Sequence, residues 1–269
     1  MYFWRLFFFC LLGAGLTDQT VAAATIAGQV ARGGDRVEIR FPVPEYFQRV
    51  AAEAGNPFPQ TGRAVLTFPK GFDPAQRWPI LIVTSTADFQ ITSPMDVDLY
   101  RDAATEEGWV ILAPDATIRP RIDSTQWRLG LLGAALEVMR KEWPQSAKWP
   151  VAFAGFSGGS KYSGTLGAML AKSGTVKICG FFLSGNNEDR LSAGFRNYHP
   201  SRDFLEIPIW LNSGAFDKVA TPSDHNLVRA SLERTGFRRV HLERFDGRHE
   251  VKMAQVRLAL RWFRETGKF

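Results

Sequence analysis

A serine, a histidine and an aspartate stand where they could together activate a hydroxyl group for nucleophilic attack. The serine is Ser157 in Gly155-Phe156-Ser157-Gly158-Gly159, directly after the apolar run 151–154. A strand-length apolar run leading into Gly-x-Ser-x-Gly predicts a buried strand, a sharp turn with the serine at its tip, and a helix that starts at once. Glycines two positions before and after the serine relieve crowding between strand and helix. The alternative is a glycine-rich strand-to-helix turn with an incidental serine.

A serine hydroxyl needs a histidine to accept its proton and a carboxylate to orient that histidine. The chain has four histidines, at His199, His225, His241 and His249. In a parallel α/β sheet, reactive groups lie beyond the carboxyl ends of the strands. His249 follows the predicted strand 240–245, whereas His241 falls inside that strand, His225 early in a helix and His199 in an irregular segment. The pattern favours His249 as the base.

The carboxylate is expected to come from another loop at a strand end. Asp217 follows the predicted strand 207–212 and precedes the histidine in the chain. Asp224 is expected to serve the start of its own helix, where a negative charge is favourable. Asp246 is expected to shape a turn. Two further acids stand in a polar loop: Glu188 and Asp189. Asp217 is therefore the favoured partner of the histidine. The alternative is that Asp217 is an ordinary exposed acid in a loop, with no catalytic role.

Acyl transfer also requires N–H groups that stabilise an oxyanion. Gly158, beside the nucleophile at the start of a helix, is expected to supply one of them. The second is expected from the backbone of Ser85, Thr86 or Ala87, after the apolar run 78–83. Aromatic residues near predicted strand ends could line a substrate cleft or pack locally: Phe89, Tyr162, Phe195, Tyr198 and Phe216.

Strands alternate with helices along most of the chain. Buried parallel strands are predicted from continuous apolar runs at 78–83, 109–113, 151–154, 178–183 and 207–212. Three further strands, with less continuous apolar sequence, are predicted at 37–41, 63–68 and 240–245. Helices are predicted at 93–107, 125–143, from the serine turn to about 171, 223–234 and 250–263. The segments 42–62 and 184–206 are read as irregular. The pattern predicts a single doubly wound α/β domain over 25–269.

The first 24 residues have the layout of a secretory signal peptide. Arg5 gives a short positive start, Leu6 to Leu16 is apolar, and small residues from Val21 to Ala24 offer a cleavage site. The apolar run is too short for an ordinary membrane-spanning helix. We therefore expect a secreted or periplasmic protein with no stable membrane span after cleavage, an uncleaved anchor being the main alternative. Cys179 would be the only cysteine left, as a small buried apolar residue.

Composition excludes several functional classes. A formal charge of +6 is spread along the chain without an aromatic-interleaved basic stripe, so no nucleic-acid partner is expected. The sequence has no HExxH motif and no cysteine pair that would indicate a metal site, and the proposed chemistry needs no cofactor. The polar loop 186–189 could bind a cation but is more simply a solvated loop.

Ser157 in its Gly-x-Ser-x-Gly turn, followed by Asp217 and then His249, each at a strand end, resembles the α/β-hydrolase superfamily from about Arg63 to the end of the chain. Within it, the chain resembles the dienelactone hydrolase, polyhydroxybutyrate depolymerase and feruloyl esterase-like branches. The resemblance implies a mostly parallel sheet with helices on both faces, and the segment 184–206 is too short to form a large lid. It has one departure: these families commonly carry His-Gly after the first central strand, and this chain has Thr84-Ser85-Thr86-Ala87 there.

These observations predict an exported serine esterase. Ser157 would form an acyl-enzyme, His249 would act as base and then as acid, and Asp217 would hold the histidine tautomer. The expected partner is a small-molecule or polymer-borne ester, and nothing in the sequence indicates an oligomeric state. Two alternatives remain: a non-catalytic binding protein on the same fold, which the missing His-Gly favours, and a serine peptidase.

Overall fold

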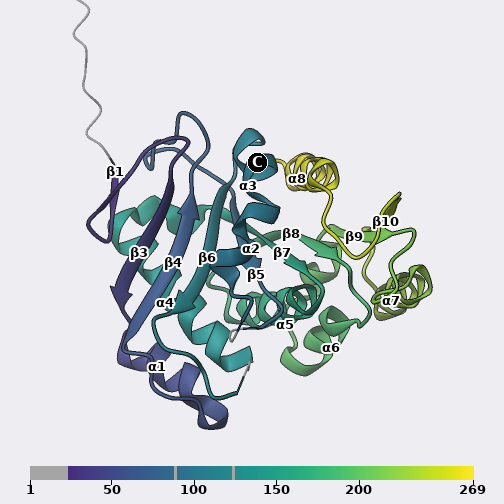
Figure 1. Cartoon of the computed structure of the whole chain (residues 1–269), viewed down its shortest axis with the longest axis horizontal. Coiled ribbons are helices and arrows are strands. Elements are labelled where there is room, and N and C mark those ends of the chain that lie inside the picture. The colour runs from purple at the N-terminus through teal and green to yellow at the C-terminus, as the bar shows by residue number, and fades with distance from the viewer. Residues whose placement is uncertain (1–23, 88–89, 123–124) are drawn as a thin grey trace, which may run out of the picture.

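The structure is a computed structural model and describes residues 24–87, 90–122 and 125–269. Its centre is an eight-stranded sheet in the order β3-β4-β6-β5-β7-β8-β9-β10, which runs across the molecule in Figure 1. The strands are β3 (Arg36–Pro42), β4 (Thr61–Thr67), β5 (Ile80–Thr84), β6 (Val110–Ala116), β7 (Pro150–Phe156), β8 (Lys177–Ser184), β9 (Ile209–Gly214) and β10 (Val240–Phe245). A separate antiparallel hairpin precedes them: β1 (Ala24–Ile26) and β2 (Gln29–Ala31).

The sheet is mostly parallel, as predicted. β3 and β4 pair antiparallel, as do β4 and β6, whereas every neighbouring pair from β6 to β10 is parallel. The parallel core strands are continuous apolar runs because both of their faces are covered. Along β5, Ile80 and Ile82 face one apolar cluster, and Leu81 and Val83 face the other.

Helices cover both faces of the sheet, which confirms the doubly wound architecture. The first cluster is covered by α1 (Glu45–Ala52), α4 (Thr125–Glu142), α5 (Gly158–Ser173), α6 (Arg190–Tyr198) and α7 (Pro222–Thr235). The second is covered by α2 (Ser93–Asp96), α3 (Arg101–Glu106) and α8 (Met253–Gly267). Short 3₁₀ turns complete the fold: 53–55, 97–99, 144–148 and 202–206. Cys179 is buried in the second cluster, as expected.

Three local predictions were wrong. The segment 42–62, read as irregular, contains α1, which packs on α4 so closely that a Cβ on Gly130 would lie 2.5 Å from the carbonyl oxygen of Phe47. The segment 184–206 contains α6, whose first turn is capped by the Asp189 side chain. The helix predicted at 93–107 is instead α2, a 3₁₀ turn and α3, because the backbone of Tyr100 leaves the helical conformation.

The order of strands in the sheet reverses at β5, which lies between β6 on one side and β7 on the other. The carboxyl end of β5 is therefore a topological switch point. In such sheets the loops that leave the strands diverge at this point, and a crevice opens between them. Ser157 directly follows β7 at this edge, and the loop from Ser85 directly follows β5. The predicted signal segment spans residues 1–24, and all of it except Ala24 lies outside the described residues. Within the described ranges, no helix is long and apolar enough to cross a membrane.

Candidate active site

Ser157 lies at a strained turn between β7 and α5. Its φ of 54° and ψ of −120° are rare for a residue with a side chain. Backbone hydrogen bonds hold this conformation: the Ser157 N–H donates to the carbonyl of Ser184 at 2.9 Å, and the Ser160 N–H and hydroxyl both donate to the Ser157 carbonyl. Such strain persists only where the surroundings enforce it, and it presents the Ser157 side chain at the sheet edge.

Gly155 and Gly159 leave room for this turn. A Cβ on Gly155 would lie 2.2 Å from the carbonyl oxygen of Gly159, and a Cβ on Gly159 would lie 2.2 Å from the carbonyl oxygen of Thr84. The Thr84 hydroxyl fixes the same contact, since it donates to the Gly159 carbonyl at 2.6 Å and lies 2.7 Å from the Ser163 hydroxyl. The start of α5 is thus held against the end of β5.

Asp217 and His249 form a hydrogen-bonded pair. Oδ2 of Asp217 lies 2.7 Å from Nδ1 of His249. The Asp217 side chain is 1% exposed and the His249 side chain 21% exposed, so the acid is enclosed while the imidazole reaches the surface of the crevice. The bond to Nδ1 leaves Nε2 as the ring nitrogen available for another partner.

Two neighbouring loops bring this pair together across more than thirty residues of chain. The Ala215 N–H donates to the carbonyl of Phe245 at 2.8 Å, and the Phe216 N–H donates to the carbonyl of Gly247 at 2.9 Å. These bonds tie the loop after β9 to the loop after β10. Gly214 permits the contact, because a Cβ there would lie 2.2 Å from the carbonyl oxygen of Arg248.

The His249 ring is packed beside the serine turn. Its centroid lies 4.5 Å from that of the Phe156 ring, and Phe156 directly precedes Ser157. Gly185, after β8, backs the imidazole: with φ of +58°, a Cβ there would lie 2.8 Å from Cε1 of His249 and 2.9 Å from Cε2 of Phe156. The structure thus brings Ser157, Asp217 and His249 to one edge of the sheet.

Hydrogen bonds keep the Asp217 carboxyl group ionised. Burial alone would raise the pKa of Asp217, but hydrogen bonds from His249 and from the N–H groups of Ala220 and Val219 together hold it below its ordinary value. The neighbouring His225 is fully buried, which lowers its pKa to about 4 and keeps it neutral. Asp217 is therefore a carboxylate that faces the His249 ring.

The loop after β5 places Thr86 against Gly158. A Cβ on Gly158 would lie 3.2 Å from Cα of Thr86. Ser85 is fully buried, and its hydroxyl donates to the Ala87 carbonyl at 3.3 Å, while the Ala87 N–H donates to the Ile91 carbonyl at 3.3 Å. Of the three residues that the sequence offered as a second oxyanion donor, Thr86 is therefore the one that flanks Gly158 at the pocket.

Arg128 of α4 supports this loop, and sequence reasoning missed it. Its guanidinium is almost fully buried; Nη1 lies 3.5 Å from the Ser85 hydroxyl, and the group stands 3.8 Å above the Tyr162 ring. An arginine inside an otherwise apolar helical pattern was the sequence signal that could have revealed it. Gly185 was also missed, and its signal was a glycine directly after a buried strand.

A pocket of about 390 Å³ opens beside Gly158 and Thr86. Tyr162 lines it, as the sequence suggested, together with Lys161, Glu188 and Arg190. Glu188 forms ion pairs with both cations, at 3.4 Å to Lys161 and 2.6 Å to Arg190. Most of this wall is therefore polar and charged.

The other predicted aromatic residues are distributed differently. Phe216 is 63% exposed beside Asp217, so it stands at the surface of the site. Phe195 and Tyr198 pack on the first apolar cluster instead of lining the pocket. Phe89 lies outside the described residues, and its predicted role stays a prediction.

The rejected acids and histidines have structural roles. Asp224 caps α7 in a reciprocal arrangement with Thr221, as expected. His241 is paired with Glu243 at 3.1 Å within β10, and His199 ends α6 in the left-handed conformation. Glu188 belongs to the ion pairs above. Among the described residues, no group of three or more His, Cys, Asp or Glu side chains could hold a metal ion.

No protein-family model and no curated protein matches the chain. Solved structures do match over most of its length. A bacterial heroin esterase is 16% identical, covers 87% of this chain and 84% of its own, and has a TM-score of 0.60. A thermophilic carboxylesterase cloned from a metagenomic library is 14% identical, with coverage of 88% and 91% and a TM-score of 0.61. A ferulic acid esterase is 12% identical, with coverage of 87% and 99% and a TM-score of 0.60.

At these identities the likeness concerns the fold. It agrees with the sequence expectation, since the mostly parallel sheet has helices on both faces and the Gly-x-Ser-x-Gly turn stands at the carboxyl edge. The same edge holds the loops of Asp217 and His249. The chain has the α/β-hydrolase fold.

Proposed function

We propose that this protein is a serine hydrolase that cleaves carboxylic esters through an acyl-enzyme on Ser157. The observation that carries the proposal is the Asp217–His249 pair, with its imidazole packed on Phe156 beside the strained serine. A histidine held by a buried carboxylate next to a partly exposed serine is the arrangement that general-base catalysis requires. The names of the similar structures, which are esterases, support the same reaction class.

The reaction proceeds in two halves. His249 takes the proton of Ser157 as Oγ attacks the ester carbonyl, and the N–H groups of Gly158 and Thr86 stabilise the oxyanion that forms. The tetrahedral species collapses, the leaving alcohol takes the proton from His249, and an acyl-enzyme remains. Water, deprotonated by His249, attacks the acyl-enzyme, and collapse releases the acid and returns the proton to Ser157. The Asp217 carboxylate stabilises the imidazolium in both halves.

The site suits a small-molecule or polymer-borne ester. The segment between β8 and β9 folds into the short helix α6 and packs against α5, so it adds no large lid over the serine turn. The pocket beside Gly158 is modest in volume and polar. A serine peptidase on this fold is the competing enzyme, and a panel of peptide amides separates the two.

Labelling by a fluorophosphonate probe tests the nucleophile without assuming a substrate. We expect the protein to be labelled at Ser157, and Ser157→Ala to lose labelling. Ser173→Ala, which changes an exposed serine at the end of α5, is the matched control and keeps it. A folded protein that is not labelled contradicts the proposal and favours the non-catalytic binding protein. Labelling that survives Ser157→Ala also contradicts the proposal, because it places the reactive nucleophile on another residue.

We also propose that the protein is exported. The support is the positively charged start, apolar run and small-residue cleavage site in the first 24 residues. The mass of the protein recovered outside the cytoplasm tests this. A chain that begins at Thr25 is expected, and an intact membrane-bound chain would show an uncleaved anchor.

A further inference from the structure

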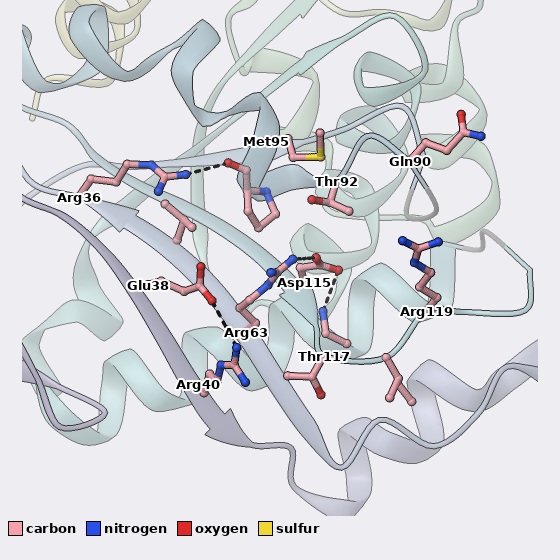
Figure 2. A pocket seen from close by; sticks show the side chains of 14 residues that line it. Arg36, Glu38, Arg40, Arg63, Gln90, Thr92, Met95, Asp115, Thr117 and Arg119 are labelled. Carbon is pink, nitrogen blue, oxygen red and sulfur yellow. Dashed lines mark hydrogen bonds and ion pairs between the residues drawn. The ribbon is translucent and has the colours of Figure 1, made fainter.

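A larger cavity, of about 540 Å³, lies beside the antiparallel part of the sheet. Figure 2 shows arginines entering it from several elements: Arg36 and Arg40 from β3, Arg63 from β4, and Arg119 from the loop after β6. Gln90 and Thr92, from the loop that follows β5, form part of its wall. Thr86, a few residues earlier in the chain after the same strand, lines the pocket beside Gly158.

The sheet register concentrates positive charge here. Arg40 on β3 lies directly opposite Arg63 on β4, and Arg63 lies directly opposite Asp115 on β6. Like charges in directly opposed positions destabilise a sheet. Asp115 offsets the charge of Arg63, whereas Arg40 on the outer strand adds a second positive charge beside it.

The acidic residues of the cavity neutralise it only in part. Four arginines face two carboxylates in its lining. Asp115 is bound by Arg63 at 2.5 Å and by the Ala116 N–H at 2.8 Å, and Glu38 lies 4.0 Å from Arg40. The buried Nε of Arg63 has no hydrogen-bond partner among the described residues. Arg119 is exposed at the rim, opposite the β3 arginines in Figure 2.

The cavity is within reach of the proposed catalytic centre. Leu112 of β6 pairs with Ile82 of β5, and Ile82 pairs with Phe153 of β7, so the end of β6 is level with the end of β7. Neighbouring strands are about 5 Å apart, which places Asp115 about 10 Å from Phe156, two strands away. In the same register Arg63 lies three strands and Arg40 four strands from β7, so the middle of the cavity is about 15 Å from Phe156. A substrate bound at Ser157 can extend over this distance.

We propose that this cavity binds an anionic group of the ester substrate, about 15 Å from the bond that is cleaved. The substrate class is then an ester that carries a carboxylate or a similar anion at its far end. The inference rests on the proposed function, because it uses Ser157 as the point of cleavage. The charged group belongs to either the acyl or the alcohol side, and the experiment has one arm for each.

The test compares matched esters that differ in one terminal carboxylate. In the acyl arm, the p-nitrophenyl monoester of dodecanedioic acid is compared with p-nitrophenyl dodecanoate. In the alcohol arm, the acetate ester of ω-hydroxydodecanoate is compared with dodecyl acetate. We expect the charged member of one pair to have the higher kcat/KM, and its advantage to fall as salt rises from about 0.05 to about 0.5 M, because exposed charges are screened.

The decisive variant is Arg40→Gln/Arg119→Gln. Both arginines are exposed, and neither is needed to neutralise the buried Asp115. Two partly screened charges, each worth a few-fold in affinity, predict a loss of about five- to twentyfold in the advantage of the charged ester. Turnover of the neutral ester stays unchanged. Arg229→Gln/Arg238→Gln removes the same charge from exposed sites elsewhere and is expected to retain the advantage.

Calorimetry with the dodecanedioate dianion on Ser157→Ala protein tests the site without turnover. Binding that Arg40→Gln/Arg119→Gln abolishes supports the cavity even if no ester is cleaved, in which case the proposed function alone has failed. Ester turnover with no advantage for a charged substrate in either arm, or with an advantage that the double variant retains, overturns the anion site and leaves the proposed function standing.

Discussion

Nδ1 of His249 lies 2.7 Å from Oδ2 of Asp217, and the two residues come from loops at the ends of the neighbouring strands β9 and β10. The carboxylate is buried, whereas the imidazole is partly exposed toward the crevice. Because Nδ1 is engaged by the carboxylate, Nε2 is the ring nitrogen of His249 that can face a nucleophile.

Asp217→Asn is predicted to lower kcat for ester hydrolysis by about 10²–10⁴-fold, because an amide no longer holds the required imidazole tautomer or stabilises its charge. Steady-state kinetics on a p-nitrophenyl ester measures this. Asp224→Asn is the control: it changes a neighbouring acid that caps α7. It is expected to cost about 1 kcal/mol of stability while the activity persists. Equal activity of Asp217→Asn and wild type would contradict the assignment.

Gly159→Ala is predicted to destabilise the protein by several kcal/mol, because the new Cβ would meet the Thr84 backbone at 2.2 Å. Gly174→Ala provides the comparison. Gly174 ends α5 with φ of +66° and open space around it, so alanine there costs only about 1–2 kcal/mol of backbone strain. Urea unfolding of both variants measures the difference. Similar midpoints would show that the turn is less crowded than described.

Gly185→Ala is predicted to reduce kcat by tenfold or more while KM changes little, since its Cβ would displace the His249 ring from Phe156. Gly71→Ala is the matched control: Gly71 has φ of +73° and no atom within 4 Å of the added Cβ. Both variants carry the same backbone strain, so a loss of activity in both would indicate general destabilisation instead of a displaced base.

Asp96 gives a pH-dependent prediction for stability. Burial, opposed by Arg128, raises its pKa to about 6. The unfolded chain therefore releases this proton at a lower pH than the folded chain does, and the contribution of Asp96 to stability falls as pH rises from about 4 to about 6. Asp96→Asn mimics the protonated form. We expect it to raise the free energy of unfolding at pH 8 by up to about 3 kcal/mol and to have no effect near pH 4. Denaturant unfolding at both pH values checks this, and a variant that is less stable at pH 8 contradicts it.

The sequence predicted the central strands well because each is a continuous apolar run with both faces covered. It missed α1 and α6 because their segments carry prolines and many polar residues, and each helix is stabilised by packing on a neighbour, α4 and α5 respectively. The helix predicted at 93–107 shows the converse: its composition suits a helix, but the backbone of Tyr100 departs from one.

The candidate site followed from position, since Asp217 and His249 each come shortly after a predicted strand at one edge. Two features of the molecule could be found only from the three-dimensional structure. The glycine that backs His249 belongs to a third strand end, and the arginine cavity depends on the cross-strand register that sets Arg40 opposite Arg63 and Arg63 opposite Asp115. Register between distant strands is not encoded in any one stretch of sequence.

The most direct test of the central claim is turnover of p-nitrophenyl acetate, butyrate and octanoate by the wild-type protein, Ser157→Ala and His249→Ala. We expect turnover by the wild type that falls by several orders of magnitude in both variants, with all three proteins folded. Turnover that persists in Ser157→Ala, or a folded wild-type protein that cleaves none of the three esters, would show that Ser157 is not the nucleophile of an esterase.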